Sequence, residues 1–144
     1  MRYEDWNNKK QKAFDALPIK FAFSEEQFDR VLNEFGLTRD NCAEYLARII
    51  GNGFMLKKDV HLLGELSQQY EEELKELLKD DVFVVDMFVY EMKNHEYQYT
   101  EEDEEITDAC GIGYEQFKAD KRLQKLFAEA RTQFWKFCAD NDWF

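Results

Sequence analysis

Apolar residues recur at three- and four-residue spacing along most of the chain, the period of a helix with one buried face. In the first such segment, Tyr3, Trp6, Phe14 and Leu17 keep this spacing until Pro18, which does not continue a helix. The same spacing predicts helices over residues 3–17, 24–35, 59–79 and 114–139. Residues typical of helix ends predict a further helix over residues 100–110.

Helix ends are marked by side chains with known preferences. Ser24 followed three residues later by Gln27 is a capping box, and Gly36 stands where left-handed backbone often follows a helix. Thr100 and Gly111 are placed in the same way around a second helix. We attribute this shared layout to the chemistry of helix ends and not to a sequence repeat.

Two segments predict a small antiparallel sheet. Residues 19–23 alternate apolar and polar side chains, as a half-buried strand does. Gly51-Asn52-Gly53 separates two apolar runs and favours a hairpin of residues 45–50 and 54–57. Residues 38–50 also fit the period of a helix. We favour the hairpin there, preceded by a short helical turn from Thr38.

Residues 82–93 fit either a buried strand or a buried helix, because almost all of them are apolar. Their length of about twelve residues favours a helix. The chain is therefore expected to be an α+β protein, mostly helical, with a small antiparallel sheet and a long C-terminal helix. Its 144 residues fit a single domain, 1–144.

The composition fits a globular protein that builds a core without metal or disulfides. Hydrophobic residues make up 44% of the chain, and Cys42, Cys110 and Cys138 are widely spaced. An odd number of cysteines without a CxxC pattern predicts free thiols in a reducing cytoplasm. The chain carries no glycine-rich phosphate loop and no metal-ligand motif, so we expect neither cofactor nor metal.

The net charge of −12 comes from the centre of the chain. Residues 59–115 hold 18 acidic and 3 basic side chains, a net charge of −15. This excess disfavours direct binding to nucleic acid and to anionic membranes, because both reward lysine and arginine.

A run of acidic residues is the densest part of this central segment. Three interpretations compete: a solvated face that keeps the protein soluble, a surface for a basic protein, and a cation site. The cation site lacks the loop pattern that calcium needs. The candidate partner-binding residues are Glu101, Glu102, Asp103, Glu104, Glu105 and Asp108.

Residues 94–100 gather versatile side chains, and His95 with Glu96 could do acid–base chemistry. The stronger interpretation is structural: Asn94 ends a helix and His95 bonds to backbone or to a neighbouring side chain. A third hypothesis is a dimerisation module that uses the aromatic residues of the C-terminal helix.

Three motifs carry a resemblance to a known family. Residues 21–28 (FAFSEEQF) resemble a "FFAFSNEQF" signature, Gly51-Asn52-Gly53-Phe54 with Lys57-Lys58 resembles a glycine turn and the end of a strand, and residues 90–100 (YEMKNHEYQYT) resemble "YELANHEYxxT". The family consists of small uncharacterised proteins of bacteriophages and gut bacteria, and the likeness spans residues 18–115. It implies a role in host takeover or in blocking host defence, as anti-CRISPR proteins do.

The resemblance and the charge together give one functional hypothesis. We expect a non-enzymatic interaction protein in the bacterial host cytoplasm, which inhibits a nucleic-acid-binding defence machine such as a CRISPR effector. Its partner is then a basic host protein, and the chain itself is a monomer or weak dimer.

Overall fold

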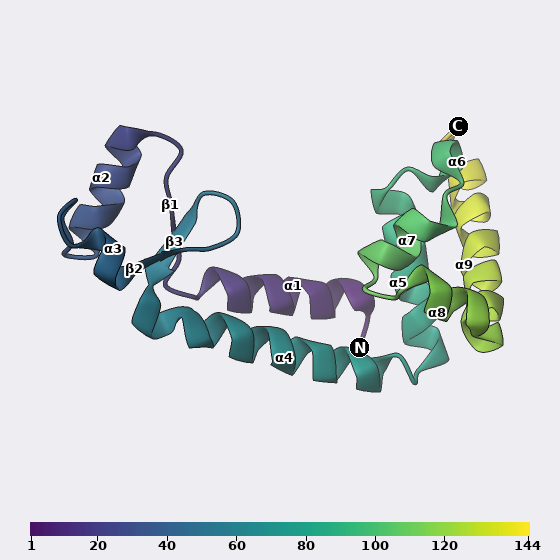
Figure 1. The fold of residues 1–144 in the computed structure, drawn as a ribbon. Helices are drawn as coiled ribbons and strands as arrows, with labels where there is room; N and C mark the ends of the chain where they lie inside the picture. The colour runs from purple at the N-terminus through teal and green to yellow at the C-terminus, as the bar shows by residue number, and fades with distance from the viewer. The chain divides into compact units, whose positions relative to one another are not determined.

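The computed structural model describes residues 1–144 and contains two compact units. We call residues 1–8 with 73–144 the helical unit, and residues 9–72 the sheet unit. The helices α1 (Tyr3–Asp15) and α4 (Val60–Leu77) each contribute to both units. Figure 1 labels the elements of each unit. The expected single domain, 1–144, stays a prediction.

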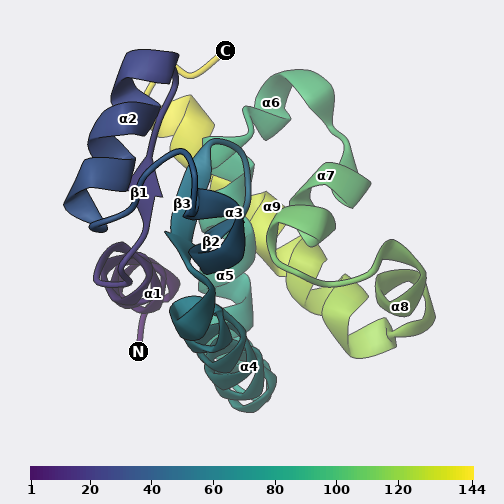
Figure 2. The same cartoon turned by 60° about the vertical axis from the view of Figure 1, so that its left-hand side comes forward.

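The helical unit is built around α5 (Asp81–Asn94), which confirms the helix predicted for residues 82–93. The side chain of Asp80 caps this helix by accepting a hydrogen bond from the Val82 amide at 2.9 Å. Its other helices are α6 (Tyr97–Thr100), α7 (Asp103–Ala109), α8 (Tyr114–Ala119) and α9 (Lys121–Asp140). Of these, α6, α7 and α9 pack on α5, and α8 packs on α7 and α9 (Figures 1 and 2).

Aromatic rings fill the core of the helical unit. Phe88 of α5 meets Phe117 of α8 and Phe127 of α9, with ring centroids 6.3 and 5.1 Å apart. The ring of Tyr97 packs edge-on against Phe127 and Phe134 of α9. All five rings are buried. The edge-to-face arrangement is one of the two that aromatic pairs prefer.

The predicted single helix over residues 114–139 is wrong, because the chain breaks at Asp120. The backbone of Asp120 is extended (φ −110°, ψ 103°), and this residue separates α8 from α9. Its carboxylate accepts a hydrogen bond from the Leu123 amide at 3.0 Å and so caps α9. Aspartate favours this role because its short side chain bonds the free amides of a first turn. The long C-terminal helix itself is confirmed as α9.

We expect Asp120→Ala to lower the free energy of unfolding by about 1 kcal/mol, because the first turn of α9 loses its cap. Chemical denaturation of both proteins measures this change. Asp140→Ala is the matched control: this exposed carboxylate lies in the last turn of α9, where a negative charge gains nothing from the helix dipole. Equal stability of Asp120→Ala and the parent would contradict the capping role.

The sheet unit confirms the predicted antiparallel sheet. Its strands are β1 (Lys20–Phe21), β2 (Leu46–Arg48) and β3 (Gly53–Leu56), in the order β1-β3-β2. Phe54 of the central strand pairs with Lys20 on one side and Arg48 on the other. The short helix α3 (Cys42–Tyr45) precedes β2, as predicted, and the 3-10 turn η1 (Lys57–Asp59) leads from β3 into α4.

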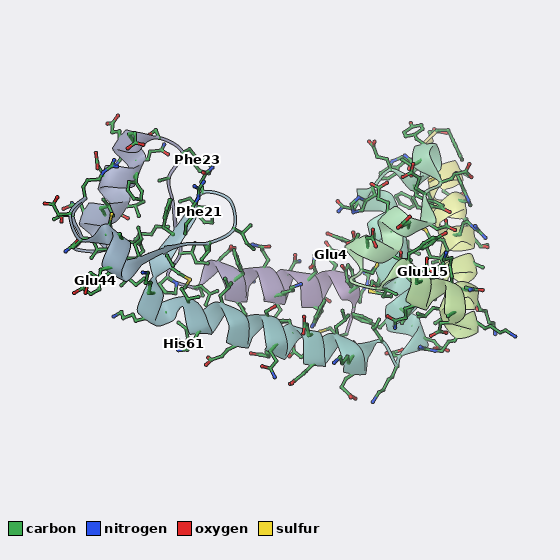
Figure 3. The ribbon with its side chains drawn as sticks, viewed as in Figure 1. Glu4, Phe21, Phe23, Glu44, His61 and Glu115 are labelled. Atoms are coloured by element: carbon green, nitrogen blue, oxygen red, sulfur yellow. The ribbon has the colours of Figure 1, made fainter.

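Helix α2 (Glu25–Glu34) covers one face of this sheet. Phe28 of α2 packs on Phe54, with ring centroids 5.0 Å apart, and Lys20 forms an ion pair with Glu34 at 3.0 Å. The predicted N-cap is confirmed, since Ser24 Oγ accepts from the Gln27 amide. The reciprocal bond of a capping box is shifted by one residue, because Gln27 Oε1 accepts from the amide of Phe23 and not from that of Ser24. Gly36 has the expected left-handed backbone, φ +72°. Phe23 remains exposed, on the segment that joins β1 to α2 (Figure 3).

Candidate functional site

The predicted acidic residues lie in one segment of the helical unit, between the end of α5 and the end of α7. Asn94 ends α5, as predicted. The backbone then turns twice through left-handed conformations, at Glu96 (φ 52°) and Glu101 (φ 48°), with α6 between them. Left-handed backbone costs a non-glycine residue about 1 kcal/mol or more. The surrounding contacts therefore hold this segment in its shape.

Thr100 does not cap α7, so that prediction is wrong. Thr100 is the last residue of α6, and α7 begins at Asp103 with Glu102 as its capping position. The Thr100 hydroxyl accepts a hydrogen bond from the Glu102 amide at 3.4 Å. Because Thr100 belongs to α6, α7 begins three residues later than predicted. Gly111 follows α7 with φ +74°, as predicted.

Several acidic side chains of this segment are exposed and without a partner. We call them the free acids, and none of them accepts a hydrogen bond or forms an ion pair through its side chain. The free acids are Glu96, Glu101, Glu102, Glu104 and Asp108. The charge of Glu104 contributes to the raised pKa of Lys118. The Lys118 Nζ, however, forms its ion pair with Glu115 at 2.9 Å, and Glu115 is the main cause of that raised pKa. Five uncompensated charges therefore face solvent within thirteen residues.

The other two predicted acids bond within the protein. The Tyr97 hydroxyl donates a hydrogen bond to Asp103 Oδ1 at 2.5 Å, and His95 Nδ1 lies 3.1 Å from Glu105 Oε1. Asp103 and Glu105 thus help to hold the segment in place. Their predicted role in partner binding stays a prediction.

His95 belongs to a polar cluster that reaches into the core. Its Nε2 lies 3.2 Å from Glu91 Oε2, and Glu91 Oε1 accepts a hydrogen bond from the Tyr3 hydroxyl at 3.1 Å. Glu91 is only 5% exposed. Burial, and then the charge of Glu91, raise the pKa of the Tyr3 hydroxyl and of the Cys110 thiol. The prediction that His95 bonds to a neighbouring side chain is confirmed.

The proposed pairing of His95 with Glu96 is not found, because Glu96 is exposed and His95 bonds to Glu91 and Glu105 instead. Both ring nitrogens of His95 are occupied by carboxylates, so neither is open to a substrate. The thiol of Cys110 is buried, and burial followed by the charge of Glu91 keeps it in its protonated form, which is a poor nucleophile. This cluster has the features of a structural network. The absence of enzymatic activity stays a prediction.

The cysteines and the possible metal ligands can be compared with the expectations from the sequence. All three cysteines are free thiols, as predicted. No three histidine, cysteine or carboxylate side chains come together in a way that could hold a metal ion. None of the helices combines the length and apolar content needed to cross a bilayer.

The C-terminal rings of Trp143 and Phe144 pack back on Phe137 and Trp135 of α9, so part of the aromatic surface is used internally. Dimerisation stays a prediction.

The Tyr97 contact predicts a loss of stability at high pH. Burial, and then the hydrogen bond to Asp103, raise the pKa of Tyr97 from 10.0 to about 12, while Arg131 opposes this shift. Folding therefore favours the protonated hydroxyl. The stability that the protonated Tyr97 hydroxyl contributes is complete below pH 10 and is lost as the pH rises through 12.

We expect the parent to lose roughly 2 kcal/mol more of its unfolding free energy than Tyr97→Phe between pH 9 and 12. Denaturation of both proteins over this range measures the difference, and the shared ionisation of the other tyrosines and the lysines cancels in it. Parallel curves for the two proteins would contradict the assigned shift.

Comparison with known proteins finds a family. The model of a protein family described as a family of unknown function, DUF7659, matches residues 2–133. No curated protein matches the chain. No solved structure matches it either.

Proposed function

The chain belongs to the DUF7659 family, and we propose that it is a binding protein that presents its acidic segment to a basic protein. The observation that carries this proposal is the set of five free acids, Glu96, Glu101, Glu102, Glu104 and Asp108. A concentration of one sign of charge steers association with an oppositely charged surface and rejects like-charged ones. No chemical turnover is part of this proposal.

Acidic side chains elsewhere in the molecule are often compensated, which sets the segment apart. Arg39 pairs with both Glu25 and Asp29, and Arg122 pairs with Asp81. Exposed pairs of this kind contribute little to stability, but they cancel charge locally. The helical unit holds 20 acidic and 10 basic side chains, a net charge of −10. Among the acidic residues that make up this excess negative charge, the free acids lie in the stretch where such residues are most closely spaced along the chain.

We further propose that the basic partner is a nucleic-acid-binding protein of host defence, in the manner of an anti-CRISPR protein in the bacterial cytoplasm. A groove built for phosphates displays lysine and arginine, and carboxylates on a fixed backbone can occupy the same positions. The chain itself, at a net charge of −12, is unsuited to nucleic acid. The charge of the chain supports this finer proposal.

Affinity capture from a bacterial lysate that contains CRISPR effectors tests the proposal, with mass spectrometry of the retained proteins. The matched bait is Glu101→Gln/Glu102→Gln/Glu104→Gln/Asp108→Asn, which removes four of the free acids. We expect the parent to retain a basic nucleic-acid-binding protein that the matched bait loses. Equal retention by both baits would contradict the role of the acidic segment.

A further inference from the structure

Most residues of helix α5 are apolar, and the helical unit leaves one side of this helix open. Along that side run Val82, which is 78% exposed, Val89, which is partly buried, and Val85, which is only 9% exposed at the floor of the opening. They line an open groove with a volume of about 820 Å³. A helix as apolar as α5 is normally covered on most sides, so the exposed Val82 and the partly buried Val89 are unusual on its open side.

Two other elements flank the groove. Tyr3 of α1 bonds to Asp86 and packs on Tyr90, so the start of α1 lies along one side of α5. Phe88 faces the opposite side, where it meets α9. The start of α1 contributes Arg2 and Glu4 to the groove lining, and α9 contributes Glu129, Gln133 and Phe137. Figure 3 shows Glu4 in the first turn of α1.

The length of the groove along α5 fits a short helix. The lining residues of α5 run from Asp81 to Asn94, about 20 Å at 1.5 Å per residue, which equals roughly three and a half helical turns. A partner helix meets such a stripe with apolar residues spaced three and four apart.

The charged side chains that line the groove indicate which kind of partner it fits. Arg2 pairs with Asp86 at 3.3 Å, and Asp81 pairs with Arg122. The ammonium of Lys93 lies 3.8 Å from the centre of the Phe137 ring. The groove lining also includes two exposed carboxylates that form no ion pair or hydrogen bond, one on each flanking helix. They are Glu4 and Glu129.

We propose that this groove binds a basic amphipathic helix of a partner protein. The apolar face of that helix covers Val82 and Val89, and its lysine or arginine side chains lie beside Glu4 and Glu129. This inference goes beyond the proposed function and uses none of the free acids, so each can fail without the other.

The probe is an 18-residue peptide of leucine and lysine with the leucines on one helical face. A scrambled peptide of the same composition is the control for charge alone. Binding to the full chain is measured by fluorescence anisotropy at 150 mM salt, and the footprint by amide shifts of the isotopically labelled chain. We expect the helical peptide to bind, the scrambled peptide to bind at least tenfold more weakly, and the shifts to centre on residues 82–93.

Matched variants separate the groove from general electrostatics. Glu4→Gln/Glu129→Gln and Glu26→Gln/Glu65→Gln change the net charge equally, and only the first pair lies in the groove. Val82→Asn and Ile50→Asn each replace an apolar side chain that is at least 78% exposed, so both should fold. We expect the groove variants to raise the dissociation constant at least fivefold and the controls less than twofold.

Several results would overturn this inference. They are equal effects of groove and control variants, equal binding of the scrambled peptide, amide shifts centred on residues 96–108, and no binding at 1 mM peptide.

Discussion

Replacing His95 with alanine should lower the free energy of unfolding by about 3 kcal/mol at pH 7. The side chain lies between Glu91 and Glu105, at 3.2 and 3.1 Å. Its removal leaves the buried carboxylate of Glu91 with only the Tyr3 hydroxyl as a partner. A buried charge that loses a partner keeps its full desolvation cost, so the loss exceeds the worth of the contact itself. Chemical denaturation measures the change.

Two further variants show whether the orphaned carboxylate is the cause. His95→Ala/Glu91→Met removes the charge and fills its place with an apolar side chain, and it should recover most of the lost stability. His61→Ala is the matched control, because this exposed ring bonds only to the Lys58 carbonyl. It should cost less than about 1 kcal/mol. A loss below that value for His95→Ala, or no recovery in the double variant, would contradict the structural role of the cluster.

Neutralising Glu101, Glu102, Glu104 and Asp108 together should slow association with the captured partner more than tenfold at low salt. Exposed charges act mainly on the association rate through long-range attraction. The difference from the parent should vanish near ~1 M salt, where the Debye length is about 3 Å. Stability should hold or rise, because these side chains have no partner to lose and repel one another. Surface plasmon resonance at several salt concentrations measures the rates.

The choice of these four positions depends on the structure. A variant designed from the sequence would include Asp103 and Glu105, which bond to Tyr97 and His95, so any loss of binding could reflect altered folding. The matched control is Glu26→Gln/Asp40→Asn/Glu44→Gln/Glu65→Gln, which changes the net charge equally on exposed, unpaired acids of the sheet unit. If both quadruple variants slow association alike, the acidic segment is no more than a solvated face.

Local chemistry allowed the sequence to predict much of the fold. The N-cap at Ser24, the left-handed Gly36 and the glycine hairpin each depend on residues within a few positions of one another. The break at Asp120 was also a local signal, because aspartate favours helix starts, but the continuous apolar spacing hid it. The spacing of apolar residues indicates which face of a helix is buried. It is a poor guide to a single residue with extended backbone that divides one helix from the next.

The polar cluster and the groove were harder to predict. The spacing of Glu91 and His95, four residues apart on one helix, could have suggested their contact. Tyr3 and Glu91 are 88 positions apart, and no local pattern connects them. The valines of α5 look like core residues in the sequence, and only the arrangement of α1 and α9 shows which of them remain uncovered.

The footprint of the captured partner on the isotopically labelled chain tests the central claim most directly. We predict that the amide shifts on complex formation at low salt include residues 96–108, and that titration to ~1 M salt reverses them as screening removes the attraction. Shifts that leave residues 96–108 unchanged, or a complex indifferent to salt, would contradict binding through the acidic segment.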